Sequence, residues 1–440
     1  MEKKVTVLHT FIQTLNNYIW NGPMLLILMA THVYFTFHLG FVQKNVWKGI
    51  RLSFTPEDKT ENKLSCFTAL STTLAATLGT GNIIGISTAV ALGGPGAVFW
   101  CWITGILGMS TTYAECFLSF LFREKQYDGS YTGGPMYVLD KGLHKKKTAI
   151  FYALCTVVAS FGVGCVTQAN AITETAYSLW NLSPSITSVC IAFVIGMVLI
   201  GGSRAIQKVC QLLVPAMAIF YVGSCILILL YHHAYLEKAC MLIVTNAFNP
   251  HAFTCGIAGG GLMLAARYGI ARGLFTNEAG LGSAAIAAVT SHTQSPKRQA
   301  LVSMTATFWD TVVMCFITGI AIVSHILHFP DSAKNTSITG LTANAFSILP
   351  YGRLLLGLSL IAFAIATLIG WSYFGKTAMN YIFPKGSGKI YETLYLIVIF
   401  LGGITSMNLV WEIADFLNAM MIAPNLFALY ALRKQILRSD

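Results

Sequence analysis

The sequence predicts an all-α membrane protein of about eleven transmembrane helices: an extra N-terminal helix, then two inverted sets of five. Three observations support this. Hydrophobic residues make up 55% of the 440 and charged residues only 10%, and the mean hydropathy is +0.65. A soluble chain has about a quarter of its residues charged, so most of this surface must face lipid. The apolar residues form membrane-length runs, and two of these runs are interrupted by glycine clusters.

A transmembrane helix needs about 20 mostly apolar residues. The ranges that meet this need are 18–37, 64–93, 96–121, 149–179, 185–201, 209–230, 253–288, 299–325, 351–375, 388–406 and 409–431. They divide the chain into an N-terminal helix with its loop (1–62), a first repeat (63–230), a second repeat (251–431) and a tail (432–440). Because each repeat has an odd number of helices, the second crosses the membrane in the opposite sense.

The basic residues predict the orientation. With the N-terminus outside, most of the 28 Lys and Arg residues, including Lys145–Lys147, Arg433 and Lys434, fall in cytoplasmic loops, whereas Lys3 and Lys4 fall outside. The positive-inside rule therefore predicts a multi-pass protein of the inner (plasma) membrane with a cytoplasmic C-terminus. The net charge of +11 is spread over short loops, so it does not indicate a nucleic-acid partner.

The helix predicted at 64–93 contains Gly79, Gly81 and Gly85. Each glycine weakens a helix by about 1 kcal/mol relative to alanine, so the backbone is expected to unwind near 79–82. Close packing of two helices at the glycines is the alternative interpretation.

Unwinding would free backbone groups on both sides of the break. The N–H groups of Thr80 and Gly81, at the start of the second half-helix, suit a carboxylate. The carbonyl groups near Ala75 and Leu78, at the end of the first half-helix, suit a hard cation such as Na⁺. The side chains of Thr80 and Asn82 add neutral oxygens.

The helix predicted at 253–288 contains a second glycine-rich interruption. Its segment 275–282, FTNEAGLG, includes Glu278, which is either a coupling carboxylate or a structural partner of Arg267 or Arg272. Broken helices at corresponding places in two inverted halves are typical of a secondary transporter with a binding site at mid-membrane.

Seven ordered motifs resemble the alanine/glycine:cation symporter family. They are LGTGNIIG (78–85), GGPGAVFWCWITGILG (93–108), DGSYTGGPMYVL (128–139), GSRAIQKV (202–209), ARYGIARGLFTNEAGLGS (266–283), FWDT (308–311) and IGWSYFGK (369–376). The family's pattern has Met where this chain has Cys101. The resemblance implies a leucine-transporter-type fold and sodium-driven, in some members proton-driven, uptake of alanine or glycine.

The resemblance also implies a substrate pocket built from both broken helices and two others. Its residues would be Thr80, Gly81, Asn82, Gln168, Phe275, Thr276 and Trp371. The cation site would combine carbonyls near Ala75 and Leu78 with the Thr367 hydroxyl. Family members often have a second hydroxyl where Ala366 stands, so the identity of the cation, Na⁺ or H⁺, stays open.

The expected function is sodium-coupled symport of L-alanine and glycine, with D-alanine as a further candidate substrate. Proton-coupled symport by the same fold is the alternative, and a membrane-embedded transferase is the less favoured one. A transferase would need a His- or Asp-rich motif at the membrane surface, and the short loops here contain none. A channel would favour repeated pore loops or rings of charge. The protein is therefore expected to be a transporter and not an enzyme.

Overall fold

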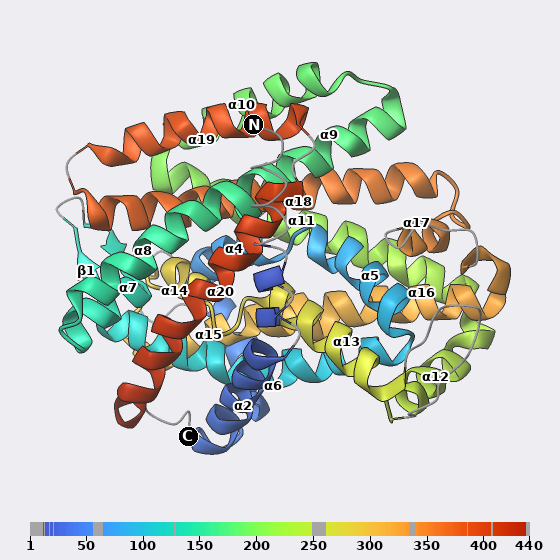
Figure 1. Ribbon diagram of the computed structural model, residues 1–440, viewed down its shortest axis with the longest axis horizontal. Coiled ribbons are helices and arrows are strands. Elements are labelled where there is room, and N and C mark those ends of the chain that lie inside the picture. Colours follow the sequence, from blue (N-terminus) through green and yellow to red (C-terminus); the bar gives the residue numbers. More distant parts are fainter. Residues whose placement is uncertain are drawn as a thin grey trace.

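The computed structural model describes residues 12, 14–16, 18–20, 22–55, 65–126, 129–248, 261–333, 340–384, 386–405 and 408–436. Within these residues the chain is almost entirely helical, with one small antiparallel hairpin (Figure 1). The predicted start of the seventh helix, 253–260, lies outside the described residues, as do Lys3 and Lys4 of the orientation argument.

The first half of the chain contains the N-terminal helix and the first repeat. Its elements are α2 (Pro23–His38), η1 (Val42–Asn45), α3 (Val46–Phe54), α4 (Ser65–Thr77), η2 (Thr80–Asn82), α5 (Ile84–Gly93), α6 (Gly96–Leu121), β1 (Glu124–Lys125), β2 (Tyr131–Thr132), α7 (Pro135–Tyr137), η3 (Val138–Gly142), α8 (Lys146–Phe161), η4 (Gly162–Val166), α9 (Thr167–Trp180), α10 (Pro184–Ile200) and α11 (Gly202–Tyr231). The π-helical turn η4 joins α8 and α9 into one long helix. Helix α3 lies in what the sequence predicts as a loop. Gly49 allows it to pack on the α15 backbone, since an added Cβ would lie 2.4 Å from the Leu301 carbonyl oxygen.

The second half contains the second repeat. Its elements are η5 (His233–Tyr235), α12 (Leu236–Phe248), α13 (Gly261–Asn277), α14 (Ser283–Ala288), α15 (Pro296–Thr307), η6 (Phe308–Cys315), α16 (Phe316–His328), η7 (Pro330–Ala333), α17 (Leu341–Phe346), α18 (Gly352–Ile382), α19 (Ser387–Ile404), α20 (Asn408–Ala431) and η8 (Arg433–Gln435). The short helices α12 and α17 are not among the predicted spans. Every predicted span is mainly helical over its described residues.

Both predicted breaks are present. Helices α4 and α5 meet at an angle of 64°. Helix α13 ends at Asn277, and Glu278, Gly280 and Gly282 adopt positive φ angles of 54°, 99° and 80° before α14 begins. Of the described helices, five are long and apolar enough to cross a membrane, or seven if each of two bent pairs is one span. The total of about eleven spans therefore stays a prediction.

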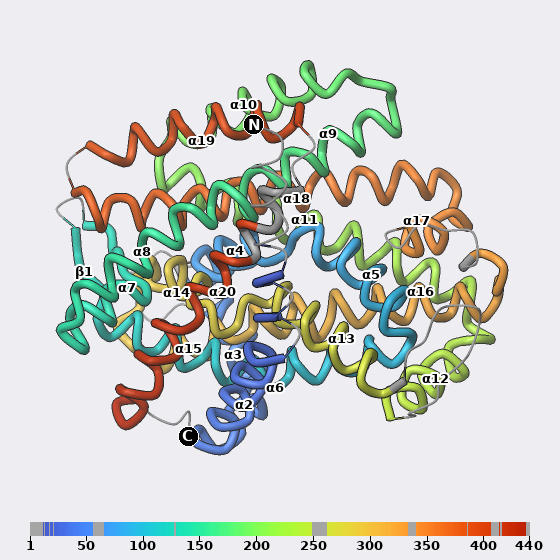
Figure 2. Tube along the Cα trace, in the orientation of Figure 1, coloured from blue at the N-terminus to red at the C-terminus, as the bar shows by residue number. Residues whose placement is uncertain are grey.

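The helices around the breaks form two packed groups. The α6 group consists of α5, α6, α13 and α15, and the α18 group consists of α8, α9, α18 and α19. Figure 1 shows the α6 group in the lower part of the molecule and the α18 group in the upper part. Helix α4 contacts members of both groups and lies between them, as the tube in Figure 2 shows. The break between α4 and α5 therefore lies where the two groups meet.

Glycine lets α13 lie directly against α6 inside the α6 group. A Cβ atom at Gly269 would lie 2.3 Å from the carbonyl oxygen of Ala97 and 2.8 Å from Cβ of Trp100. The first of these contacts involves helix backbone, which cannot rotate away as a flexible side chain can. The two helices would have to separate to admit a side chain.

We predict that Gly269→Ala destabilises the fold by about 1–3 kcal/mol, the usual cost of overpacking a tight contact. Thermal unfolding in detergent should show a lower midpoint than that of the unmodified protein. Gly223→Ala in α11 is the matched control, because a Cβ there meets nothing within 4 Å. Equal midpoints for the two variants would contradict the close contact between α13 and α6.

Candidate functional site

The break between α4 and α5 is held open by one buried amide. Gly79 is extended, and its N–H donates to Oδ1 of Asn82 over 3.0 Å. The Nδ2 group of Asn82 donates to Asp310, over 2.7 Å to the Oδ1 atom and 3.1 Å to the main-chain oxygen. The Asn82 side chain therefore accepts the hydrogen bond that the Gly79 N–H would otherwise donate within a helix, and it connects the break to η6.

The same break leaves backbone donors open, among them those of Thr80 and Gly81. In the described part of the chain, the N–H groups of Thr80 and Gly81 have no hydrogen-bond acceptor. They precede α5, where the positive end of the helix dipole favours an anion. An unpaired N–H group inside a membrane is costly, so this arrangement is suited to a carboxylate ligand.

The break between α13 and α14 is stabilised by polar side chains from other helices. The Gly280 N–H donates to Oε1 of Glu115 over 2.8 Å, and Asn425 donates to the Gly280 carbonyl over 2.9 Å. Asn425 also donates to the same Glu115 oxygen over 2.6 Å. The Ser283 hydroxyl donates to Oε2 of Glu278 over 2.5 Å. Glu278 therefore stabilises the start of α14.

A cavity of about 390 Å³ lies between the two breaks. Its walls come from α4, η2 and α5, from η4 and α9, and from α13 and α18. Six of the seven predicted substrate residues line it: Thr80, Gly81, Gln168, Phe275, Thr276 and Trp371. The seventh, Asn82, does not line the cavity and is fully buried behind the break.

Polar contacts join the cavity walls at the level of the break. The Thr80 hydroxyl donates to Oε1 of Gln168 over 3.4 Å. On the other side, a Cβ at Gly81 would lie 3.4 Å from the Thr276 hydroxyl, which itself donates to the Arg272 carbonyl. The Thr276 side chain of α13 therefore faces the unwound backbone at Gly81.

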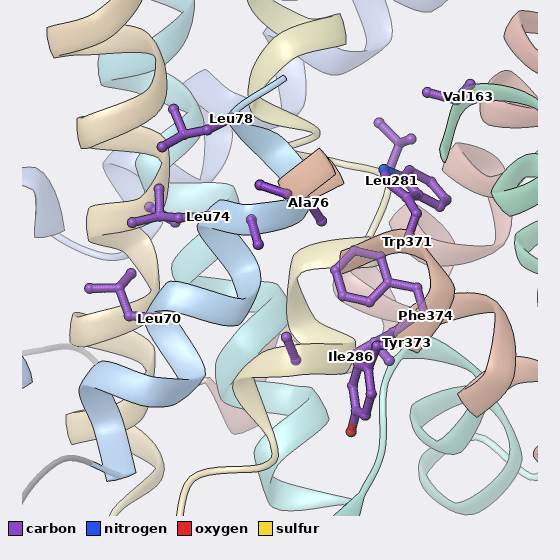
Figure 3. Close-up of a cluster of buried hydrophobic side chains, with 14 of the residues drawn as sticks. Leu70, Leu74, Ala76, Leu78, Val163, Leu281, Ile286, Trp371, Tyr373 and Phe374 are labelled. Carbon is purple, nitrogen blue, oxygen red and sulfur yellow. The ribbon is translucent and has the colours of Figure 1, made fainter. Parts of the chain in front are cut away.

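Trp371 closes one side of the cavity. Its side chain packs on the π-helical turn η4, where a Cβ at Gly164 would lie 2.2 Å from Cβ of Trp371. Figure 3 shows Trp371 together with Phe374, Leu281 and Ala76 in one buried apolar cluster. Trp371 therefore presents a rigid apolar wall to the cavity, backed by tight packing.

Oxygens for a cation meet beside the break. The Thr367 hydroxyl contacts the Leu78 carbonyl oxygen at 3.3 Å and the Phe363 carbonyl oxygen at 3.0 Å. A Cβ at Gly79 would lie 2.9 Å from the Thr367 hydroxyl, so glycine is needed there. Ala75 lies about one turn before Leu78 on α4. Neutral carbonyl and hydroxyl oxygens are the ligands that hard cations prefer.

Comparison with known proteins identifies the family. The model of the sodium:alanine symporter family matches residues 5–439. The chain belongs to this family. The sodium/alanine symporter AgcS of Methanococcus maripaludis is 39% identical over 96% of this chain and 94% of that protein. The probable sodium/glutamine symporter GlnT of Bacillus subtilis is 30% identical over 98% of this chain and 89% of its own length.

Solved structures show the same fold. The transporter MhsT in complex with L-phenylalanine superposes with a TM-score of 0.59 at 14% identity, over 86% of this chain and 90% of that one. A Na⁺-coupled sialic acid symporter superposes with a TM-score of 0.51 at 12% identity, over 90% of this chain and 82% of that one. The predicted leucine-transporter-type fold is confirmed. Membership of the sodium:alanine symporter family makes the protein a membrane transporter that couples amino-acid symport to a cation, and not an enzyme.

Glu278, predicted as a coupling carboxylate or a structural partner, also lines the cavity, and two further charged residues of the lining were not predicted as site residues. Glu174 on α9 and Arg272 on α13 both line it. On α9 the lining residues Thr167, Asn170 and Glu174 are spaced three and four apart, which places them on one face of the helix. This spacing is visible in the sequence, but it does not reveal which face of the helix meets the cavity.

We predict that Thr367→Val raises the cation concentration for half-maximal transport at least about tenfold, which corresponds to about 1.4 kcal/mol of lost binding. The change keeps the shape of the side chain but removes the oxygen that meets the Leu78 carbonyl. Thr367→Ser is the control, since it keeps the hydroxyl. Transport measured against Na⁺ concentration checks the expectation, and equal cation dependence of the Val variant and the unmodified protein would rule out this cation site.

Proposed function

We propose that this member of the family uses an inward sodium gradient to carry alanine and glycine into the cell. The observation that supports this most strongly is the pairing of two open N–H groups, at Thr80 and Gly81, with the oxygens at Leu78 and Thr367. Both sets lie on the same break, so a bound cation and a bound carboxylate would stabilise each other. The oxygens are neutral and cannot hold a proton at neutral pH, which favours sodium.

The substrate is proposed to bind with its carboxylate on the open N–H groups and its side chain towards Phe275 and Trp371. Gln168, which contacts Thr80, lies beside the same position. Asn82 is proposed to act indirectly, by holding the break open from behind. The packed Trp371 ring limits the room for a side chain, because extra methylene groups against a rigid wall overpack it.

The direction in which the cavity extends supports an outward-facing state. From the break it continues along Gly85 and Thr88 of α5 and towards Glu174 of α9. These segments lead to helix ends that the charge distribution predicts to be outside. Rocking of the α6 group against the α18 group would then expose the site inward. A negative interior adds about 2.3 kcal/mol per cation charge per 100 mV to the driving force.

The test is uptake of radiolabelled L-alanine into liposomes that contain the purified protein. An imposed sodium gradient should drive accumulation that unlabelled glycine competes away, whereas a proton gradient alone should not. Accumulation driven by a proton gradient alone would indicate that a buried carboxyl group couples transport to protons. Glu278 would then be the first residue to replace. An absence of alanine accumulation under either gradient would reject alanine as the substrate.

We predict that Trp371→Phe admits larger side chains and weakens alanine binding, because it removes part of the rigid wall. Competition of labelled alanine uptake by unlabelled valine, leucine and glutamine should become at least about tenfold more effective relative to glycine, as expected for one to two additional accommodated methylene groups. Trp309→Phe in η6, outside the cavity lining, is the control. An unchanged competition profile would exclude Trp371 as the determinant of substrate size.

A further inference from the structure

The cavity wall that contains Gln168 depends on the π-helical turn η4, which precedes it. The carbonyl oxygen of Val163 in this turn accepts from the Thr167 hydroxyl over 2.6 Å and from Nε2 of Gln168 over 3.2 Å. The backbone bonds of a π-turn span five residues instead of four, so its carbonyl groups lie outside the regular α-helical pattern. Because Val163 holds one end of the Gln168 amide, the other end, Oε1, accepts from the Thr80 hydroxyl. The position of the turn therefore decides where Gln168 meets the cavity.

One tyrosine outside the cavity contacts both this turn and α18. Tyr395 of α19 is fully buried and does not line the cavity. Its hydroxyl donates to the carbonyl oxygen of Gly164 in η4 over 3.0 Å and to that of Leu368 in α18 over 2.9 Å. Leu368 lies less than one turn before Trp371 on α18. A single hydroxyl therefore connects the turn behind Gln168 to the part of α18 that carries Trp371.

Close packing makes the turn and α18 depend on each other. A Cβ at Gly164 would lie 2.2 Å from Cβ and 2.5 Å from Cγ of Trp371. On the other side of the turn, a Cβ at Gly402 of α19 would lie 2.8 Å from Cα of Val166. Tyr395 and Gly402 are separated by about two helical turns, so they lie on the same face of α19. The turn is therefore held between α18 and α19.

The Tyr395 hydroxyl has one proton for two acceptors. Both carbonyl oxygens carry a negative partial charge, so without a donor between them they repel each other. They are also buried where water does not replace a lost hydrogen bond, and the loss of a partner is costly there. Removal of the hydroxyl should therefore let η4 move away from α18 at this point.

We propose that Tyr395 is a positioning residue that sets the distance between Gln168 and Trp371, and with it the size of the side chain that the cavity admits. It acts through the carbonyl groups of Gly164 and Leu368 and does not contact the substrate. This inference rests on the proposed function, in that it assumes an amino acid bound between these two walls.

The test compares Tyr395→Phe with Tyr391→Phe, two changes that each remove one buried hydroxyl from the same face of α19. The Tyr391 hydroxyl contacts that of Ser160 at 2.8 Å, before the turn, so Tyr391→Phe is the matched control. In liposomes, Tyr395→Phe should raise KM for alanine at least about threefold and change the maximal rate less than about twofold, as expected when binding alone is weakened.

The competition profile reports the distance between the two walls. With Tyr395→Phe, unlabelled valine should compete with labelled alanine at least about threefold more effectively relative to glycine, because a wider space admits additional methylene groups. The control should keep the profile and the KM of the unmodified protein. If both variants keep them, or if both change them equally, Tyr395 does not position the walls.

Hydrogen–deuterium exchange in detergent gives a second measurement that does not depend on the transported substrate. Amides within 162–171 should exchange at least about threefold faster in Tyr395→Phe than in Tyr391→Phe or the unmodified protein, since the turn is less restrained. Unchanged exchange would overturn the proposal, as would faster exchange with an unchanged competition profile. If the unmodified protein does not accumulate alanine, the proposed function fails, and the profile measured with the amino acid that it accumulates best decides the role of Tyr395.

Discussion

An unpaired backbone N–H or C=O group inside a bilayer costs several kcal/mol, and this protein breaks two helices in the membrane interior. Both breaks are therefore accompanied by buried polar side chains that replace the missing helical partners. Asn82 satisfies the first break and reaches Asp310, whereas Glu115 and Asn425 satisfy the second. These contacts fix which helices surround each break. The donors left open at Thr80 and Gly81 are consequently available to a ligand.

Glycine determines how closely the α18 group approaches the first break. A Cβ at Gly370 of α18 would lie 2.6 Å from the backbone nitrogen of Ala76, and one at Gly79 would lie 2.9 Å from the Thr367 hydroxyl. The Thr367 hydroxyl and the Leu78 carbonyl oxygen, which are proposed to bind the cation, meet because glycine at these positions places no side chain between α4 and α18.

The helices and both breaks could be predicted from the sequence, because lipid imposes long apolar runs and glycine interrupts them. Four of the six predicted residues that line the cavity, Thr80, Gly81, Phe275 and Thr276, lie at or close to the two breaks, whereas Gln168 and Trp371 come from α9 and α18 and were predicted from the family resemblance. The partner of Asn82 could not be predicted, because Asp310 is 228 positions away and no local pattern joins the two. The position of Glu174 in the cavity could not be predicted either, because periodicity defines a helix face but not the element that this face contacts.

The π-helical turn η4 has an evolutionary consequence. A π-turn contains one residue more than the α-helical turn it replaces, and such turns often occur at functional sites. The number of residues in the turn 162–166 therefore sets how the side chains of α9 are rotated about the helix axis. Loss of one residue there would turn Gln168 and Glu174 by about 100° away from the cavity without altering either side chain. Relatives with a shorter turn would present a different face of this helix to their substrate, so a change in chain length can alter specificity as effectively as a substitution in the pocket.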